Sequence, residues 1–268
     1  MKLFDLSGEV ATVIGASGVI GGAIAEGLAE AGAKVAVIAR SPQNGEARTK
    51  SIRDKGGAAA YFKADATETA QLREACAAIE KQLGPTSVLV NCAGGNDSKT
   101  TITPENPFEK IPLEAWKANY HLNLVGGALL PCQIFGPGML ARKKGSIINI
   151  ASVSAHLPLS RVASYSAAKA SVVNLSMFLA REWGSRGIRV NTITPGFFPA
   201  DQNKALLFQE DGAPTERTRS IWLHTPMGRF GDASELVGAA IFLASPRASS
   251  FVTGADLRVD GGFLCQTI

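Results

Sequence analysis

Residues 9–22 read EVATVIGASGVIGG, a short apolar, β-branched run followed by a segment with four glycines. The run at residues 9–14 predicts a buried strand, and residues 23–32 place Ile24, Leu28 and Ala31 at helical spacing. Glycines let a backbone approach a pyrophosphate closely, and the first turn of a helix offers free N–H groups. The segment therefore predicts the phosphate-binding loop of a dinucleotide fold. The loop residues predicted to bind the cofactor are Gly15, Ser17, Gly18, Val19, Ile20 and Gly21.

The rest of the chain continues the alternation of strands and helices. Further strands are predicted at residues 34–39, 58–63, 86–90, 146–151, 188–193 and 256–259, and helices at residues 43–56, 67–83, 111–135, 163–185 and 232–244. This order predicts an α/β fold, with one Rossmann-like, doubly wound domain over residues 1–268. It would hold a parallel sheet of about seven strands with helices on both faces.

Three local features complete this prediction. Thr67 is expected to cap its helix. The apolar segment 124–140 contains Pro131 and Pro137, and is interpreted as a buried helix that breaks rather than a membrane span. Residues 197–229 form a longer polar stretch, predicted to be an insertion that carries the substrate loop.

Composition narrows the class of protein. The chain has 268 residues, 46% hydrophobic and 19% charged, and its net charge of +4 is too small and dispersed to indicate nucleic-acid binding. The N-terminus lacks the apolar core of a signal peptide. Four cysteines without a C-x-x-C pair favour reduced thiols over disulfides or a metal site, and the three histidines are scattered. We therefore expect a cytoplasmic protein without nucleic-acid, membrane or metal partners.

The end of the second predicted strand bears on the choice of cofactor. A carboxylate there would hold the ribose diol of NAD, but Ala39 and Arg40 occupy the position. A guanidinium can pair with a 2′-phosphate, and Ser41 stands beside it. This favours NADP(H), with NAD(H) still possible. The alternative is that Arg40 is a solvated loop charge.

Tyr165 and Lys169 lie four residues apart on a predicted helix and so share one face. The lysine charge is expected to lower the tyrosine pKa from about 10. A phenol tuned in this way can give a proton to a carbonyl oxygen or take one from an alcohol. Ser152 follows the strand at 146–151, at the sheet edge where α/β proteins present their chemistry. Because Tyr-x-x-x-Lys also occurs by chance, the pair needs support from the rest of the chain.

Taken together, these motifs resemble the short-chain dehydrogenase/reductase family over essentially the whole chain. The resemblance rests on the glycine loop, residues 91–94, Asn123, Ser152, Tyr165 with Lys169, and residues 195–196. It implies that Tyr165 is the general acid/base, that Lys169 holds the nicotinamide ribose, and that Ser152 bonds the substrate oxygen. Asn123 would anchor a water that links Lys169 to solvent, or bind its own helix backbone.

The resemblance also implies further cofactor contacts and an oligomer. The cofactor contacts would be Asp65, Ala66, Asn91, Ala93, Gly94, Pro195, Gly196 and Phe198, besides Tyr165 and Lys169. The alternative interpretation is that Asp65 is a turn residue that flanks a helix. A homotetramer is expected, and the apolar segments 241–243 and 262–264 favour it.

The glycine loop departs from the family pattern at two positions. Ile14 replaces a threonine, and Val19 stands where the middle glycine is usual. The turn is therefore expected to be rebuilt around Gly18.

The loops on the substrate side resemble the D-mannonate oxidoreductase (fructuronate reductase) branch, which acts on hexuronate-derived keto acids. Asn96, Ser152, His156, Gln202 and Asn203 are predicted to bind the substrate. The cations Arg161, Lys204, Arg217, Arg219 and His224 are candidate partners of a carboxylate. Arg229 is predicted to be structural, in the turn before the helix at 232–244.

The sequence therefore predicts an NADP(H)-preferring reductase of a hexuronate-derived keto sugar acid. A second hypothesis keeps the reaction and changes the substrate to another sugar, polyol or keto acid, such as a deoxy-keto-uronate. A third is a non-catalytic cofactor-binding sensor. The complete set of Ser152, Tyr165, Lys169 and Asn123 argues against the sensor.

Overall fold

The computed structural model describes residues 2–200 and 206–266. Within this part of the chain, seven parallel strands form one sheet in the order β3-β2-β1-β4-β5-β6-β7. The strands are β1 (Val10–Ile14), β2 (Lys34–Ala39), β3 (Ala58–Lys63), β4 (Val88–Asn91), β5 (Gly145–Ile150), β6 (Ile188–Pro195) and β7 (Asp256–Val259). The direction of winding reverses between β1 and β4, which is where doubly wound folds bind ligands. The predicted fold class is confirmed.

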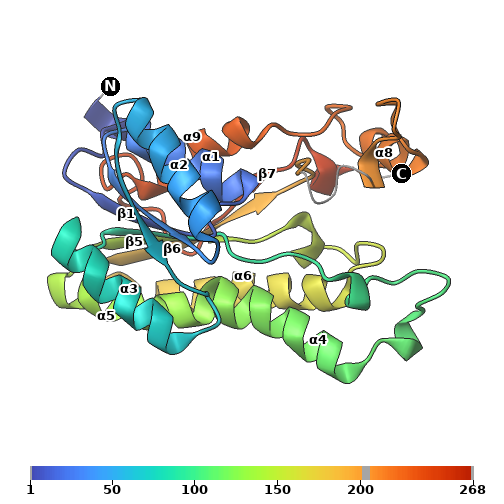
Figure 1. Ribbon diagram of the computed structural model, residues 1–268, viewed down its shortest axis with the longest axis horizontal. Coiled ribbons are helices and arrows are strands. Elements are labelled where there is room, and N and C mark those ends of the chain that lie inside the picture. Colours follow the sequence, from blue (N-terminus) through green and yellow to red (C-terminus); the bar gives the residue numbers. More distant parts are fainter. Residues whose placement is uncertain (1, 201–205, 267–268) are drawn as a thin grey trace.

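Helices cover both faces of the sheet (Figure 1). One face carries α1 (Val19–Glu30), α2 (Pro42–Asp54) and α9 (Val237–Ala244). The other carries α3 (Thr69–Gln82), α4 (Leu113–Tyr120), α5 (Leu130–Arg142) and α6 (Ala163–Trp183). The strands β1 and β4 are buried along their whole length, as apolar strands covered on both faces must be. The short helix α8 (Glu216–Leu223) lies at one end of the molecule, beyond the sheet.

The predicted break in the apolar helix is wrong. A π-helical segment, His121–Leu129, joins α4 to α5 without interruption. Pro131 follows this wider turn, which offers room for the proline ring that a regular α-helix lacks. By length and composition alone this helix is long and apolar enough to cross a membrane, a test that core helices of globular proteins also pass. Here Phe135 and Met139 are buried in the core.

The structure shows which residues cap the start of α3 and the helical turn before α9. Thr67 does not cap α3, because its hydroxyl and N–H both bond Asp65, at 2.7 and 2.9 Å. Before α9, Asp232 and Glu235 form a reciprocal capping box. Arg229 pairs with both carboxylate oxygens of Glu235, at 2.8 and 2.7 Å. The structural role predicted for Arg229 agrees with this pairing.

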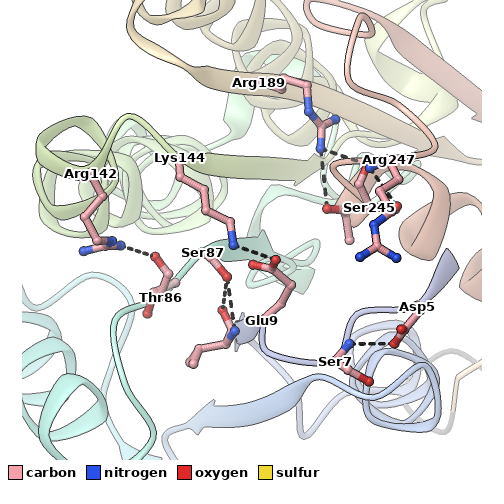
Figure 2. Close-up of polar contacts among 12 residues, drawn as sticks. Asp5, Ser7, Glu9, Thr86, Ser87, Arg142, Lys144, Arg189, Ser245 and Arg247 are labelled. Carbon is pink, nitrogen blue, oxygen red and sulfur yellow. Dashed lines mark hydrogen bonds and ion pairs between the residues drawn. The ribbon is translucent and has the colours of Figure 1, made fainter. Parts of the chain in front are cut away.

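Polar contacts close the edge of the sheet at which the strands begin (Figure 2). The Lys144 ammonium lies 2.6 Å from a carboxylate oxygen of Glu9, ahead of β5 and β1. Arg142 donates to the backbone oxygen of Thr86 at 2.7 Å, before β4. Arg189 donates to the backbone carbonyls at the C-terminal end of α9. Because the strands are parallel, all of them end at the opposite edge of the sheet. The contacts described above therefore leave the carboxyl ends of the strands available for a functional site.

Candidate active site

The glycine loop packs tightly between β1 and β4. Gly15 has a φ of +82°, and a Cβ on it would lie 2.8 Å from the Ala93 nitrogen. A Cβ on Gly21 would lie 2.4 Å from the Gly15 oxygen. Both contacts are with backbone, which cannot move aside. Glycine is therefore required at both positions to bring the start of α1 onto the sheet.

Gly18, around which the turn was expected to be rebuilt, lies directly at the start of α1. Gly18 is the N-cap residue with φ −76° and ψ 170°, a conformation open to any residue. The N–H groups of Val19 and Ile20 have no partner among the described residues, as expected in a first helical turn. The backbone N–H of Gly21 favours the thiolate of Cys92, although burial raises the pKa of this thiol overall, to about 11. Val19 and Ile20 can therefore donate to a phosphate, whereas Gly21 contributes by close packing.

Arg40 leaves the end of β2 with its side chain 73% exposed, and its Nη1 lies 3.8 Å from an Asp65 carboxylate oxygen. Burial raises the pKa of Asp65, but hydrogen bonds from Thr67 and the Arg40 charge outweigh burial and lower it overall. Asp65 therefore acts as the turn residue of the alternative interpretation while it also holds Arg40 beside the loop. This arrangement offers a cation at the predicted 2′-phosphate position.

Two neighbours of Arg40 and Asp65 have local structural roles. The Ser41 hydroxyl accepts from the Asn44 N–H at 3.4 Å and caps α2, and it can still donate its own hydrogen to an anion. Ala66 is buried and faces the core, so any cofactor contact by Ala66 would involve its backbone groups.

Asn123 is fully buried in the π-helical segment. Its Oδ1 accepts from the Gly95 N–H at 2.9 Å, and its Nδ2 donates to the Gly95 and Asn119 oxygens, both at 2.8 Å. The backbone-binding alternative for Asn123 is thus observed. Since both amide hydrogens are used, only Oδ1 retains a lone pair for the predicted water.

Sequence reasoning missed two residues that support this contact. Asn119 Nδ2 donates to the Gly95 oxygen at 3.2 Å, and the Ser164 hydroxyl donates to Asn119 Oδ1 at 2.9 Å. Both side chains are buried. Gly95 is therefore held by two asparagines, and Ser164 ties them to the start of α6. The spacing of Asn119 and Asn123, one helical turn, was the available signal.

Lys169 is 4% exposed, and its ammonium donates to the Ile150 oxygen at 2.7 Å. It lies 5.7 Å from the centre of the Tyr165 ring. Burial lowers the pKa of Lys169 to about 8. A Cβ on Gly94 would lie 3.4 Å from this ammonium and 2.6 Å from Asn123 Oδ1. The residues just after β4 thus pack closely against Lys169 and Asn123.

The predicted fall in the pKa of Tyr165 is wrong. Burial raises the pKa of Tyr165, and hydrogen bonding to Ser152, which is itself buried, lowers it less. Desolvation disfavours a phenolate more strongly than a lysine beside the ring can favour it. Tyr165 is therefore a protonated phenol at neutral pH, suited to donate to a carbonyl oxygen.

The residues after β4 and β6 reach the site mainly through their backbones. The Asn91 side chain points into the core and donates to Asn149 Oδ1 at 2.7 Å. Ala93 lies against Gly15. At the end of β6, Pro195 completes the strand and Gly196 donates its N–H to the Val259 oxygen at 3.0 Å.

Phe198 packs its ring against Gly231. Its predicted contact with the carboxamide of the cofactor would therefore be made by its backbone groups.

Besides Ser152, four residues were predicted to bind the substrate. His156 Nε2 lies 3.0 Å from an Asp256 carboxylate oxygen at the start of β7, which engages one of its two ring nitrogens, and its substrate contact stays a prediction. Asn96 is exposed and donates to the Thr101 hydroxyl at 2.6 Å, in the loop after β4. Gln202, Asn203 and the candidate cation Lys204 lie outside the described residues.

These observations define an oxidoreductase site on a dinucleotide-binding fold. The glycine contacts and the two free N–H groups fit a pyrophosphate, and Ser152, Tyr165 and Lys169 stand at the adjoining strand end. In the described residues no group of histidine, cysteine, aspartate and glutamate side chains has the arrangement of a metal site.

Comparison with known proteins identifies the family. The family model described as enoyl-(acyl carrier protein) reductase matches residues 15–264. An uncharacterised oxidoreductase of Haemophilus influenzae is 37% identical over 97% of this chain and 94% of its own length. Gluconate 5-dehydrogenase of Gluconobacter oxydans is 36% identical over 97% and 96%. The chain belongs to the short-chain dehydrogenase/reductase family and is an NAD(P)-dependent oxidoreductase.

Two solved structures share the fold along their whole length. A candidate D-mannonate oxidoreductase of Haemophilus influenza with bound NAD has a TM-score of 0.93 and 36% identity, over 98% of this chain and 97% of that one. A gluconate 5-dehydrogenase of Burkholderia cenocepacia in complex with NADP and tartrate has a TM-score of 0.88 and 35% identity, over 99% and 98%. The family thus includes similar proteins with either nicotinamide cofactor.

Proposed function

We propose that the protein reduces the keto group of a hexuronate-derived keto sugar acid, of the D-fructuronate/D-mannonate type, with NADP(H) as the preferred cofactor. The observation that carries this proposal is the joint placement of Ser152, Tyr165 and Lys169 beside the glycine loop. A protonated phenol next to a hydroxyl and a buried cation suits proton transfer to a ketone oxygen.

Four side chains of the protein each have a defined task in the proposed reaction. The bound nicotinamide supplies or accepts a hydride at the substrate carbon. Tyr165 gives its proton to the substrate oxygen during reduction and takes one back during alcohol oxidation. Ser152 bonds that oxygen and stabilises the phenolate that forms. Lys169 places positive charge behind the phenol, and Asn123 fixes the loop that borders it.

The sugar-acid substrate is supported by the relatives and by the charge of the loops. One relative and one solved structure are gluconate 5-dehydrogenases, and another structure is a candidate D-mannonate oxidoreductase. The tartrate in one of them is a hydroxylated dicarboxylate. A gluconate-type substrate, the 5-keto acid of gluconate, is therefore the second candidate.

A substrate screen tests the proposed function. We expect the purified protein to oxidise NADPH fastest with D-fructuronate, followed by 5-keto-D-gluconate and a 3-deoxy keto sugar acid. Initial rates at several concentrations give kcat/KM for each compound and cofactor. Neutral ketoses and a ketoacyl thioester serve as controls. Preference for one of these controls over every keto sugar acid contradicts the assignment.

Replacement of Arg40 by alanine should weaken NADPH binding roughly 10-fold and leave NADH binding nearly unchanged. One charge-assisted hydrogen bond contributes about 1.5–3 kcal/mol, and the exposure of Arg40 places its effect at the lower end. Ala39→Asp should shift the preference toward NADH. The measurement is kcat/KM with each cofactor, with Arg73→Ala, an exposed arginine on α3, as control. Equal loss with both cofactors contradicts a 2′-phosphate contact.

A homotetramer is proposed for the assembly. In the expected segments, Leu243 and Phe263 are buried in their own chain, whereas Ile241, Phe242 and Leu264 are only partly buried. Met177 and Phe178 on α6 are 48% and 53% exposed, a further apolar surface that a second copy would cover. Light scattering at micromolar concentration should give the mass of four chains, and Phe178→Glu should lower it. A wild-type monomer contradicts the proposal.

We also propose a cytoplasmic location. It is supported by the thiols of Cys76, Cys92, Cys132 and Cys265, all of which are free.

A further inference from the structure

His156 ends the short turn that Ser152 begins. Ser152 is the N-cap of a 3₁₀ turn, Val153–Ala155, and His156 is its C-cap. The Ser152 carbonyl oxygen accepts from the Ala155 N–H at 2.9 Å, and the Val153 oxygen accepts from the His156 N–H at 3.1 Å. The hydrogen bonds of this turn therefore couple the position of Ser152 to that of His156.

The imidazole of His156 lies against the carboxylate of Asp256, the first residue of the edge strand β7. The distance from His156 Nε2 to Asp256 Oδ2 is 3.0 Å, and the two side chains are only 23% and 19% exposed. Oδ2 itself is buried, and among residues 2–200 and 206–266 no other group donates a hydrogen bond to it. Loss of the imidazole would leave this buried oxygen without a partner, which is unfavourable.

The second oxygen of Asp256 is fixed by β6. The hydroxyls of Thr192 and Thr194 donate to Asp256 Oδ1 at 2.5 and 2.6 Å, and both threonines are buried. Residues two apart on a strand face the same side of the sheet, so β6 presents both hydroxyls to one carboxylate. The His156 ring is thereby attached to two neighbouring strands through a carboxylate whose orientation is fixed.

These contacts hold the Ser152 segment on both sides. Before Ser152, the Ala151 N–H donates to the Ile193 oxygen at 2.8 Å and continues the pairing of β5 with β6. After Ser152 the chain turns away from this pairing, and the His156 side chain ties it to β7. The orientation of the turn, and with it the place of the Ser152 hydroxyl, therefore depends on the contact between His156 and Asp256.

We propose that His156 and Asp256 are positioning residues, which hold the Ser152 hydroxyl where it bonds the Tyr165 phenol and the substrate oxygen. The proposal rests on the proton-transfer roles proposed above for Ser152 and Tyr165. A hydrogen bond weakens steeply as its length and angle depart from the optimum. A small rotation of the turn would therefore lower the rate of proton transfer while leaving the glycine loop unchanged.

The first test measures kcat and KM of His156→Ala and Asp256→Ala with the best substrate of the screen described above. Each variant should lower kcat about 10- to 100-fold, the cost of slightly misplaced groups, with little change in KM or in NADPH affinity. The double variant should be no slower than either single one, because the two residues act through one contact. His156→Gln should recover much of the loss, since its amide nitrogen can donate to Asp256 as Nε2 does.

The pH profile shows whether the pair acts through Ser152. Hydrogen bonding to Ser152 lowers the pKa of Tyr165, so displacement of Ser152 should raise this pKa. The rise of alcohol oxidation should therefore move to higher pH in His156→Ala. In a Ser152→Ala background, His156→Ala should change kcat by less than about 2-fold. Lys169 and Cys92, the other titratable groups that lie near Tyr165 or act on it, are kept in every variant.

Thr12→Val is the matched control for a loss of stability alone. Thr12 is buried in β1, and its hydroxyl contacts that of Thr86, which precedes β4, at 2.8 Å. This variant should have a lower Tm but the kcat and pH profile of the wild type. The same result for His156→Ala, a lower Tm with an unchanged kcat, overturns the positioning role.

Two further outcomes separate this proposal from its alternatives. A higher KM in His156→Ala but not in Asp256→Ala overturns the positioning role and makes His156 a substrate contact. If Ser152→Ala and Tyr165→Phe keep the wild-type kcat, the proposed function itself is wrong. If those two variants are slow and His156→Ala is not, the proposed function stands and only the positioning role is wrong.

Discussion

Tyr165→Phe should lower kcat by 10²–10⁴-fold, the usual contribution of a positioned acid or base, and leave cofactor affinity unchanged. The substitution removes only the phenolic hydroxyl and keeps the ring beside Lys169. Because burial raises the pKa of Tyr165, the wild type should reduce ketones readily at neutral pH. Alcohol oxidation needs the phenolate, so its rate should rise with pH.

The measurement compares kcat in both directions across pH, together with the dissociation constant of NADPH. Tyr120→Phe is a matched control, since the Tyr120 hydroxyl contacts the Ser171 hydroxyl at 2.8 Å on the helix face away from the reaction. Ser152→Ala should move the rise of alcohol oxidation to higher pH, because hydrogen bonding to Ser152 lowers the pKa of Tyr165. A Tyr165→Phe variant with more than about a hundredth of the wild-type kcat contradicts the assigned role.

Lys169→Met should reduce kcat on the order of 10²-fold yet make the cofactor-free protein more stable at pH 7. Burial lowers the pKa of Lys169 from 10.5 to about 8. Between these values the unfolded chain binds more protons than the folded chain, so wild-type stability rises with pH there. Below about pH 8 the full ionisation penalty, on the order of 3 kcal/mol, lowers the stability of the wild type.

Methionine fills a similar volume and carries no charge, so the variant avoids this penalty. The lost hydrogen bond to the Ile150 oxygen should offset about 1 kcal/mol of the gain. Thermal unfolding at pH 7 and pH 10 measures the difference in stability between the variant and the wild type. This difference should be smaller at pH 10. Lys117→Met, at an exposed ion pair with Glu114, should change stability little at either pH. A variant that is less stable than wild type by the same amount at both pH values contradicts a buried, charged lysine.

The sequence by itself determined the order of the elements and indicated the candidate catalytic residues. Apolar runs that alternate with helical spacing predicted every strand, and the bounds of β2, β3 and β7 agree with the predicted ranges. Tyr165 and Lys169 followed from their spacing on one helix, and Arg229 from its tight turn. These features depend on residues close in sequence, where periodicity and turn chemistry act directly.

Only the tertiary structure decided the properties that depend on burial and on distant residues. Burial reversed the expected shift of the Tyr165 pKa, because desolvation is set by the whole fold and not by a neighbour one turn away. His156 pairs with Asp256, one hundred positions later in the chain. Charges and burial act through space, so their partners cannot be predicted from spacing along the chain.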